Sequence, residues 1–216
     1  MARNSVRASS QYLSHAAGVI SAYPFSIACW FRSNDDTTHQ TIFAMTSLTG
    51  TVRIYIRGDV VGDPVRYDLE GGTGNHAISG GTFVANQWHH VCAVAASSTS
   101  ATLYLDGSSI GTDTDSATVP SLTLTEFFVD QGSTVRAEYF SGDIAEVGVW
   151  TAALDAAEVN ALSKAAAPSL LRPGSLEAYW PLLGNDSPEP DRWGSYNLTL
   201  NNAPVKATHP RITYPH

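Results

Sequence analysis

The sequence predicts an all-β protein, a two-sheet antiparallel sandwich with one short helix after its last core strand. Three observations predict it. The nearly unbroken apolar run His89–Ala96 is typical of a strand that is buried on both faces of a sheet. The next segment, Ala101–Asp106, alternates apolar and polar residues and ends in an Asp-Gly turn with Gly107, which indicates a hairpin. Further on, Asp155 is followed three residues later by Glu158, the pattern of a helix capping box.

The N-terminal third is expected to supply an edge strand, a longer strand and a hairpin. We place the edge strand around Ser10–Ser14 and the longer strand over Phe25–Phe31, where apolar and aromatic residues dominate. After a polar loop, the segments Thr41–Ala44 and Thr51–Arg57 form the hairpin. In the second of these segments every other residue is apolar, which marks the inward face by Val52, Ile54 and Ile56.

A glycine-rich stretch separates the next short strand, Val65–Glu70, from the central hairpin. Glycine-rich loops can bind phosphate, but those loops lie between a strand and a helix and carry a lysine or a defined glycine spacing. The stretch Gly71–Gly81 has neither feature and leads into another strand. We therefore expect it to be a mobile connection.

Two strands and the helix follow the central hairpin. The strands are expected over Leu122–Asp130 and Tyr139–Trp150, and the second of them is the last strand of the sandwich. In the helix, Val159 and Leu162 fall on one face. The helix is therefore expected to lie on the sandwich as a short lid.

The chain is interpreted as one sandwich domain, residues 1–167, followed by a tail, residues 168–216. After a proline-containing linker, the tail has two further segments with strand character, Leu176–Leu182 and Tyr196–Leu200. They either complete the sandwich or project and pair with a neighbouring subunit. An uncovered strand pair is only marginally stable, which favours completion.

Composition and charge exclude several functions. The 216 residues carry a net charge of −8, which argues against nucleic acid as a partner, because that affinity depends on neutralising phosphates with Lys and Arg. No apolar run is long enough to cross a membrane, and the N-terminus lacks the apolar centre of a signal peptide. We expect a protein that is made in the cytoplasm and has no membrane partner.

Three strings of residues resemble one family. They are Pro24–Phe31 (PFSIACWF), Trp88–Gly111 with its W-H-H-V and L-Y-L-D-G elements, and Phe140–Trp150 (FSGDIAEVGVW) with the helix after it. In this order they are similar to the laminin G-like and pentraxin-like modules of the concanavalin A-like lectin/glucanase superfamily. The resemblance implies that the sandwich is a jelly roll.

The resemblance also implies a disulfide between two strands, as in pentraxins. Cys92 falls on the family position, but Cys29 lies one residue later, which turns its side chain to the opposite face of the sheet. We expect two buried free thiols, with a disulfide as the alternative.

Hydrolysis is disfavoured by one position. β-Glucanases of the superfamily carry E-x-D-x-x-E on a strand, with the outer glutamates as nucleophile and acid. Here Asp143 and Glu146 match the pattern, but Ser141 stands in place of the first glutamate. We therefore expect no enzyme activity.

Calcium is the cofactor that the resemblance implies. The positions that match the metal-binding loop of pentraxins are Asp130, Gln131 and Glu138, all of which offer oxygen ligands. The other half of that site falls at Thr49-Gly50, whose donors are weak. The alternative is a solvated acidic loop.

Aromatic side chains in or beside polar segments could stack on a sugar or fill a partner's pocket; they are Tyr67, Tyr139, Trp193 and Tyr214. For each one, ordinary partial burial is the favoured interpretation. If the protein is a lectin, glycan contacts are expected in the loops Asn34–His39, Gly71–Gly81 and Asp130–Glu138. The predicted ligand-binding residues are Asp130, Gln131, Glu138, Tyr139 and Trp193.

The sequence is compatible with two functions. The C-terminal string His209–Tyr214 (HPRITY) resembles free-standing laminin G-like proteins of tailed bacteriophages, which implies a non-enzymatic structural protein on the virion surface. Its partners would be copies of itself in a homo-oligomer or other virion proteins. The alternative is a lectin-type domain that binds glycans, with or without calcium.

Overall fold

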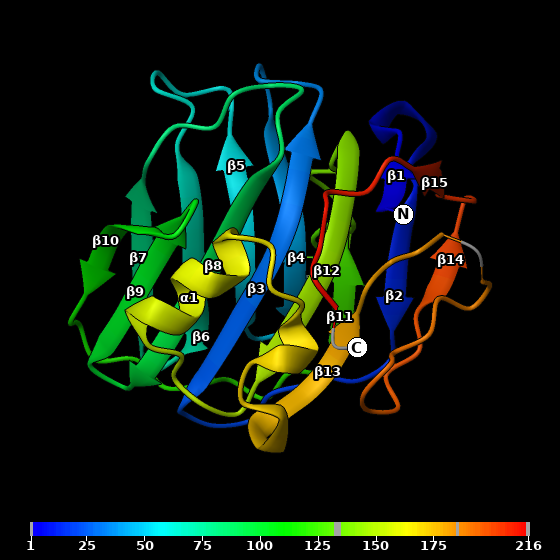
Figure 1. The fold of residues 1–216 in the computed structure, drawn as a ribbon. Coiled ribbons are helices and arrows are strands. Elements are labelled where there is room, and N and C mark those ends of the chain that lie inside the picture. Colours follow the sequence, from blue (N-terminus) through cyan, green and yellow to red (C-terminus); the bar gives the residue numbers. More distant parts are fainter. Residues whose placement is uncertain (1, 132–134, 185, 215–216) are drawn as a thin grey trace.

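The computed structural model describes residues 2–131, 135–184 and 186–214. Within these residues the strands form two antiparallel sheets that pack face to face, and one α-helix follows the last long strand (Figure 1). The sandwich predicted from the sequence, with its short helix, is confirmed.

One sheet contains eight strands in the described part of the chain, in the order β10-β9-β8-β3-β12-β1-β15. One side of β12 is shared, because β1 pairs with its first half and β13 with its second half. The strands are β1 Ala2–Ser5, β3 Phe25–Ser33, β8 His89–Ser97, β9 Ser100–Leu105, β10 Ser108–Asp113, β12 Gly142–Trp150, β13 Leu176–Trp180 and β15 Val205–Ala207.

The other sheet has seven strands among the same residues, in the order β14-β2-β11-β4-β5-β6-β7. The strands are β2 Tyr12–His15, β4 His39–Thr46, β5 Thr51–Arg57, β6 Val65–Gly72, β7 Gly74–Gly80, β11 Leu124–Phe127 and β14 Thr199–Asn201. Short 3-10 helices cover Arg7–Ser9, Pro168–Leu170 and Pro173–Ser175.

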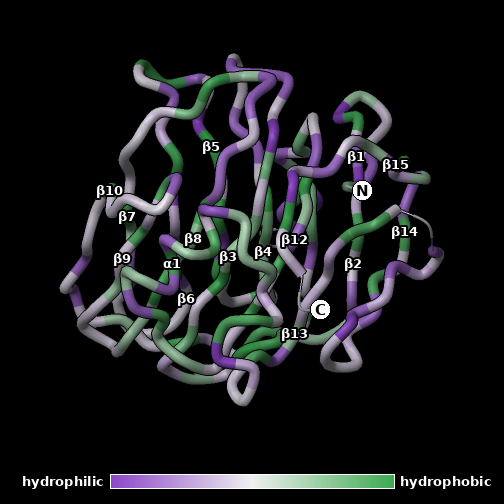
Figure 2. Tube along the Cα trace, viewed as in Figure 1, coloured by the Kyte–Doolittle hydropathy of each residue, from purple (hydrophilic) through white to green (hydrophobic). Residues whose placement is uncertain are grey.

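The main core lies between the two sheets and is built from alternate residues of their strands. Hydrophobic residues recur along the strands of both sheets in Figure 2. The predicted inward face of β5 is confirmed, because Val52, Ile54 and Ile56 are all fully buried in this core. The ring of Phe127 lies 5.2 Å from those of both Phe43 and Trp180, so an aromatic row links the two sheets.

A second, smaller core covers the outer face of the eight-stranded sheet. Helix α1, Ala156–Ser163, places Val159 and Leu162 against this face, as predicted, together with Trp150 of β12 (Figure 1). The two cysteines show how the faces differ. Both are free thiols, with Cys29 in the main core and Cys92 in the smaller core, because the register offset turns them to opposite faces.

The predicted capping box of α1 is present. Asp155 Oδ1 accepts hydrogen bonds of 2.9 Å from the backbone N–H groups of Ala157 and Glu158, and Glu158 Oε2 accepts one from the Asp155 N–H. We expect Asp155→Ala to lower the free energy of unfolding by about 1 kcal/mol, because two backbone donors lose their acceptor. Urea unfolding would measure this, and Asp155→Asn, which keeps a cap oxygen, should lose less.

The glycine-rich stretch is a strand and not a connection, so that prediction was wrong. Strand β7 forms the edge of the seven-stranded sheet, with Ile78 pointing inward and Ala77 exposed. Its glycines permit close approach to other backbone: a Cβ at Gly74 would lie 1.8 Å from the Ser116 carbonyl oxygen, and one at Gly80 would lie 2.4 Å from that of Ile110. The glycines therefore reflect tight packing of an edge strand.

Other boundaries also differ from the prediction. Strand β11 ends at Phe127 because Phe128 has a left-handed backbone, with a φ of 71°. Strand β2 is not an edge, since β14 pairs with its outer side. Strands β1, β10 and β15 were not predicted, and each is short or polar.

The tail contributes strands to both sheets. In this chain β13 and β15 pair within the eight-stranded sheet, and β14 pairs with β2 in the other. The division of the chain at residue 167 stays a prediction. Within the described residues no helix has the length and apolar character that a membrane span needs.

Candidate functional site

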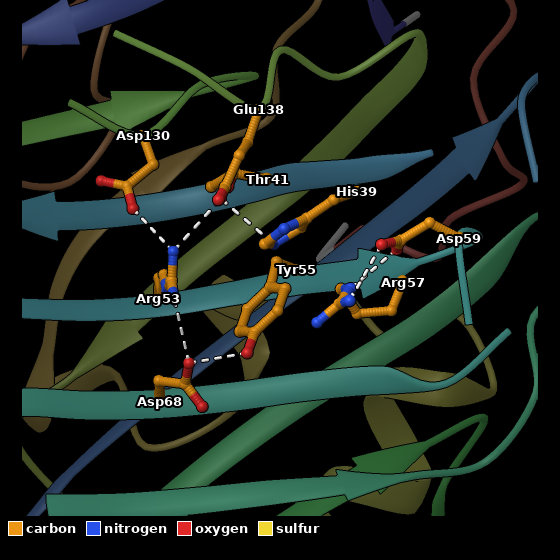
Figure 3. Close-up of polar contacts among 9 residues, drawn as sticks. All are labelled: His39, Thr41, Arg53, Tyr55, Arg57, Asp59, Asp68, Asp130 and Glu138. Carbon is orange, nitrogen blue, oxygen red and sulfur yellow. Dashed lines mark hydrogen bonds and ion pairs between the residues drawn. The ribbon is translucent and has the colours of Figure 1, made fainter. Parts of the chain in front are cut away.

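The candidate site lies on the outer face of the seven-stranded sheet, over β4, β5 and β6 (Figure 3). The same alternation that buries every second residue of β5 turns Arg53, Tyr55 and Arg57 outward. On the next strand, β6, Arg66 lies opposite Tyr55 and Asp68 lies opposite Arg53. A strip of charged side chains therefore crosses this face of the sheet.

Arg53 is the centre of the strip. Its Nη1 atom lies 2.9 Å from Asp130 Oδ2 and 3.1 Å from Glu138 Oε2, and its Nη2 atom lies 3.2 Å from Asp68 Oδ2 (Figure 3). Asp130 and Glu138 come from the connection between β11 and β12, so the guanidinium ties this connection to the sheet. Burial lowers the pKa of Arg53, but the three carboxylates outweigh it and raise the pKa, which keeps Arg53 charged.

Tyr55 is enclosed by cations and does not offer an open ring. The centroid of its ring lies 4.5 Å from the guanidinium carbon of Arg53, 5.4 Å from that of Arg66 and 4.8 Å from the ring of His39. Its hydroxyl donates a hydrogen bond of 2.7 Å to Asp68 Oδ2. The side chain therefore organises the arginines around it and is not a platform for stacking.

His39 is held in its neutral form. Burial, followed by the positive charges of Arg53 and Arg57, lowers the pKa of His39 to about 4, although its Nε2 atom lies 3.1 Å from Glu138 Oε2. Desolvation also raises the pKa of Glu138, and Arg53 opposes that rise. At neutral pH the imidazole thus adds a polar group but no charge to the face.

We expect this histidine to make stability pH-dependent. Its pKa in the folded state lies below the unfolded value, so its contribution is present above about pH 6.5 and is lost as the pH falls towards 4. The groups that face it are Arg53, Arg57, Asp59, Arg66 and Glu138.

The size of this effect is on the order of 2 kcal/mol. Chemical unfolding at pH 7.5, 5.5 and 4.5 should show a smaller loss for His39→Gln than for the wild type. Equal losses for the two proteins would contradict the assignment.

The site opens towards solvent at Arg57 and Arg66. Arg57 makes two contacts with Asp59, Nε to Oδ1 at 2.7 Å and Nη2 to Oδ2 at 2.8 Å, and both side chains are partly exposed. Further along the sheet, Arg136 Nε lies 2.6 Å from Glu126 Oε1. Charges of both signs are therefore interleaved along this face.

Three buried polar atoms of this face have no hydrogen-bond partner among the described residues: Arg53 Nε, Arg66 Nε and Asp68 Oδ1. An unpaired buried polar atom costs about 1–3 kcal/mol. Such a cluster is expected where a protein keeps polar groups for a further partner, either water or a ligand.

The structure brings together two of the residues that the sequence predicted. Asp130 and Glu138 converge on Arg53. Tyr139 lies apart from them, with its ring 6.4 Å from that of Tyr12. Gln131 lines a different, small hollow beside Thr46, and Trp193 lies 44% exposed in the connection between β13 and β14.

The donor set does not fit the implied calcium ion. The carboxylates of Asp130 and Glu138 both face the Arg53 guanidinium, which takes the position that a cation would need. In the described residues no group of three or more His, Cys, Asp or Glu side chains is suited to a metal.

The two acids of β12 are committed to structural contacts. Asp143 accepts hydrogen bonds of 2.7 Å from Arg32 Nε and 2.8 Å from Asn4 Nδ2. Glu146 accepts 2.5 Å and 2.7 Å bonds from the hydroxyls of Tyr179 and Tyr214. The exposed fractions of Asp143 and Glu146 are 3% and 2%.

Two of the candidate aromatic residues are also committed. Tyr67 is fully buried in the main core and is not available for stacking; its alternation with outward Arg66 and Asp68 turns it inward. Tyr214 lies 42% exposed, but its hydroxyl is bound to Glu146.

A larger hollow than the small one beside Thr46 lies elsewhere in the sandwich. It has a volume of about 760 Å³ and is lined by the loops 18–24 and 119–122, with Tyr196 and Glu177 at one side. The hydroxyl of Tyr23 donates to the Ala117 carbonyl and that of Tyr196 to Glu177. None of the unpaired buried atoms found in the described chain belongs to its lining, so we favour the sheet face.

The sequence prediction missed the residues of β5 and β6 that carry this site: Arg53, Tyr55, Arg57, Arg66 and Asp68. The sequence feature that could have revealed them is the set of outward-facing positions in the alternating pattern of these two strands. These positions hold arginines and a carboxylate in a chain that is only 15% charged, where an ordinary solvent face would carry Ser or Thr.

A family model described as the Concanavalin A-like lectin/glucanases superfamily matches residues 7–160. The chain belongs to this superfamily. A search of curated proteins finds no significant relative. The resemblance to laminin G-like modules is confirmed by the match, whereas an origin in a bacteriophage is not addressed by it.

Several solved structures share the fold of this chain at low sequence identity. A putative carbohydrate binding protein from Bacteroides ovatus superposes with a TM-score of 0.69 at 18% identity, over 98% of this chain and 61% of that one. The native heptameric SAP-like pentraxin of Limulus polyphemus gives 0.61 at 14%, over 91% and 89%. The CBM40 of the Ruminococcus gnavus IT-sialidase, bound to α2,3-sialyllactose, gives 0.57 at 14%, over 66% and 84%.

Proposed function

We propose that the chain is a non-enzymatic glycan-binding domain whose site is the outer face of β4, β5 and β6. The observation that carries this proposal is the concentration of charged side chains and unpaired polar atoms on that face. A sugar hydroxyl both donates and accepts hydrogen bonds, so a face of interleaved guanidinium and carboxylate groups suits it. Two of the similar structures are of carbohydrate-binding proteins, which supports the same function.

A glycan array with the purified chain tests the proposal. Binding to a defined set of glycans is expected, and chelation of calcium should leave it unchanged, since Arg53 stands between the carboxylates. Arg57→Gln and Asp59→Asn should weaken binding, because these partly exposed groups offer contacts to a ligand.

The matched control is Arg172→Gln, which breaks an ion pair with Glu158 of α1 over the other sheet and should bind as the wild type does. Mass spectrometry of the bound glycan should show no cleavage. Absence of binding to every glycan would overturn the proposal.

A structural role in an assembly, as on a virion surface, is a second proposal. The similar pentraxin is described as heptameric, which is the observation that favours it. Light scattering that gives a discrete oligomer at micromolar concentration would support it, and a monomer would overturn it. The pairing of β13, β14 and β15 within this chain gives no support to a tail that acts as an assembly arm.

A further inference from the structure

We propose that the glycan bound by this face carries a carboxylate group and that Arg66 binds it. The inference rests on the proposed function and adds the chemical class of the ligand. The other guanidinium groups of the face already have carboxylate partners. Arg53 contacts three carboxylates, Arg57 is paired with Asp59, and Arg136 is paired with Glu126.

Arg66 is the exception on this face. Among the described residues its side chain has no ion pair and no hydrogen bond, and its guanidinium carbon lies 5.4 Å from the centroid of the Tyr55 ring. Its Nε atom is buried and unpaired, so the two terminal nitrogens are the part of the guanidinium that a ligand can reach. Two parallel N–H groups match the two oxygens of a carboxylate.

The surroundings of Arg66 leave room for a ligand. In the register of the sheet it lies between Tyr55 of β5 and Ser79 of β7. The residues of β7 that share this face are Ala77 and Ser79, which are both small and exposed. A sugar can therefore approach over the edge strand, with the Ser79 hydroxyl as a second contact.

The local electrostatics agree with an acidic ligand at this end of the strip. The carboxylates of Asp68, Asp130 and Glu138 contact Arg53, whereas at the end that holds Arg57 and Arg66 the described residues place one carboxylate, that of Asp59, in an ion pair with an arginine. The positive charges of Arg53, Arg57 and Arg66 all lower the pKa of His39, so the three arginines together make the electrostatic potential around His39 more positive. An anion bound at Arg66 would supply the counterion that this arginine lacks.

Paired oligosaccharides that differ in one acidic group test the inference by calorimetric titration. The probes are α2,3-sialyllactose against lactose, a galacturonic acid-terminated against a galactose-terminated oligosaccharide, and a sulfated analogue of the latter. We expect the wild type to bind the carboxylate members about tenfold more tightly. Arg66→Gln should lose that preference and keep its affinity for the neutral members. Arg172→Gln is the control, and the melting temperatures of both variants report on folding.

The outcomes separate the two proposals. Equal affinity of the wild type for acidic and neutral members, or an unchanged preference in Arg66→Gln, would overturn the role of Arg66 and leave glycan binding standing. Equal or tighter binding of the sulfated analogue would overturn the assignment of a carboxylate. Failure to bind any member of this panel or of the array would overturn the proposed function itself.

Discussion

Replacement of Arg53 by alanine is expected to lower the free energy of unfolding by about 3 kcal/mol. The Arg53 side chain is 16% exposed and holds Asp68 and Asp130, whose side chains are 4% and 5% exposed. Without it, three carboxylates would lose the cation that they share and would repel one another. Urea unfolding at pH 7 measures the loss.

Two further measurements tie that loss to the carboxylates. The deficit of Arg53→Ala relative to the wild type should shrink between pH 7 and pH 4, because protonation removes the repulsion. Millimolar calcium should raise the melting temperature of Arg53→Ala and leave that of the wild type unchanged, since the guanidinium that separates the carboxylates is absent only in the variant.

The matched control is Arg57→Ala. It also removes an arginine from β5, but its ion pair with Asp59 is partly exposed, so we expect a loss below about 1 kcal/mol. A similar loss in both variants would contradict a special role for Arg53. A rise in the melting temperature of the wild type with calcium would contradict the view that the guanidinium takes the place of the ion.

The alternation of β5 shows what the sequence could and could not predict. The inward residues of this strand were predicted because burial leaves a local pattern of period two, and the packing of Val52, Ile54 and Ile56 follows it. The site depends instead on contacts between residues far apart. Arg53 meets carboxylates 77 and 85 positions later, through a connection whose path no local pattern records.

The family resemblance placed Asp130 and Glu138 in one site, around a calcium ion. In the structure both carboxylates contact an arginine of β5 instead. The sequence could not predict this contact, because it depends on the register that places Arg53 opposite Asp68 and on the path of the connection that carries Asp130 and Glu138.

The second large effect is expected at Glu146. This residue lies in the irregular part of β12, with a φ of 55°, and its side chain is 1% exposed. It accepts hydrogen bonds from the hydroxyls of Tyr179 and Tyr214, and lies 2.9 Å from His209 Nε2. Two of these three partners belong to the last segment of the chain, so this buried acceptor holds that segment on the sandwich together with the backbone bonds that Thr213 makes to Ala165 and Ala167.

We expect Glu146→Ala to lower the free energy of unfolding by about 3–4 kcal/mol, because the donors in the buried site lose their acceptor. Limited proteolysis should then cut the segment around Arg211 faster than in the wild type. Glu146→Gln keeps one acceptor oxygen without the charge and should fall between the two. Unfolding of Glu146→Ala at the wild-type urea concentration, or continued resistance of the segment around Arg211 to protease, would contradict this role of the carboxylate in holding the last segment in place.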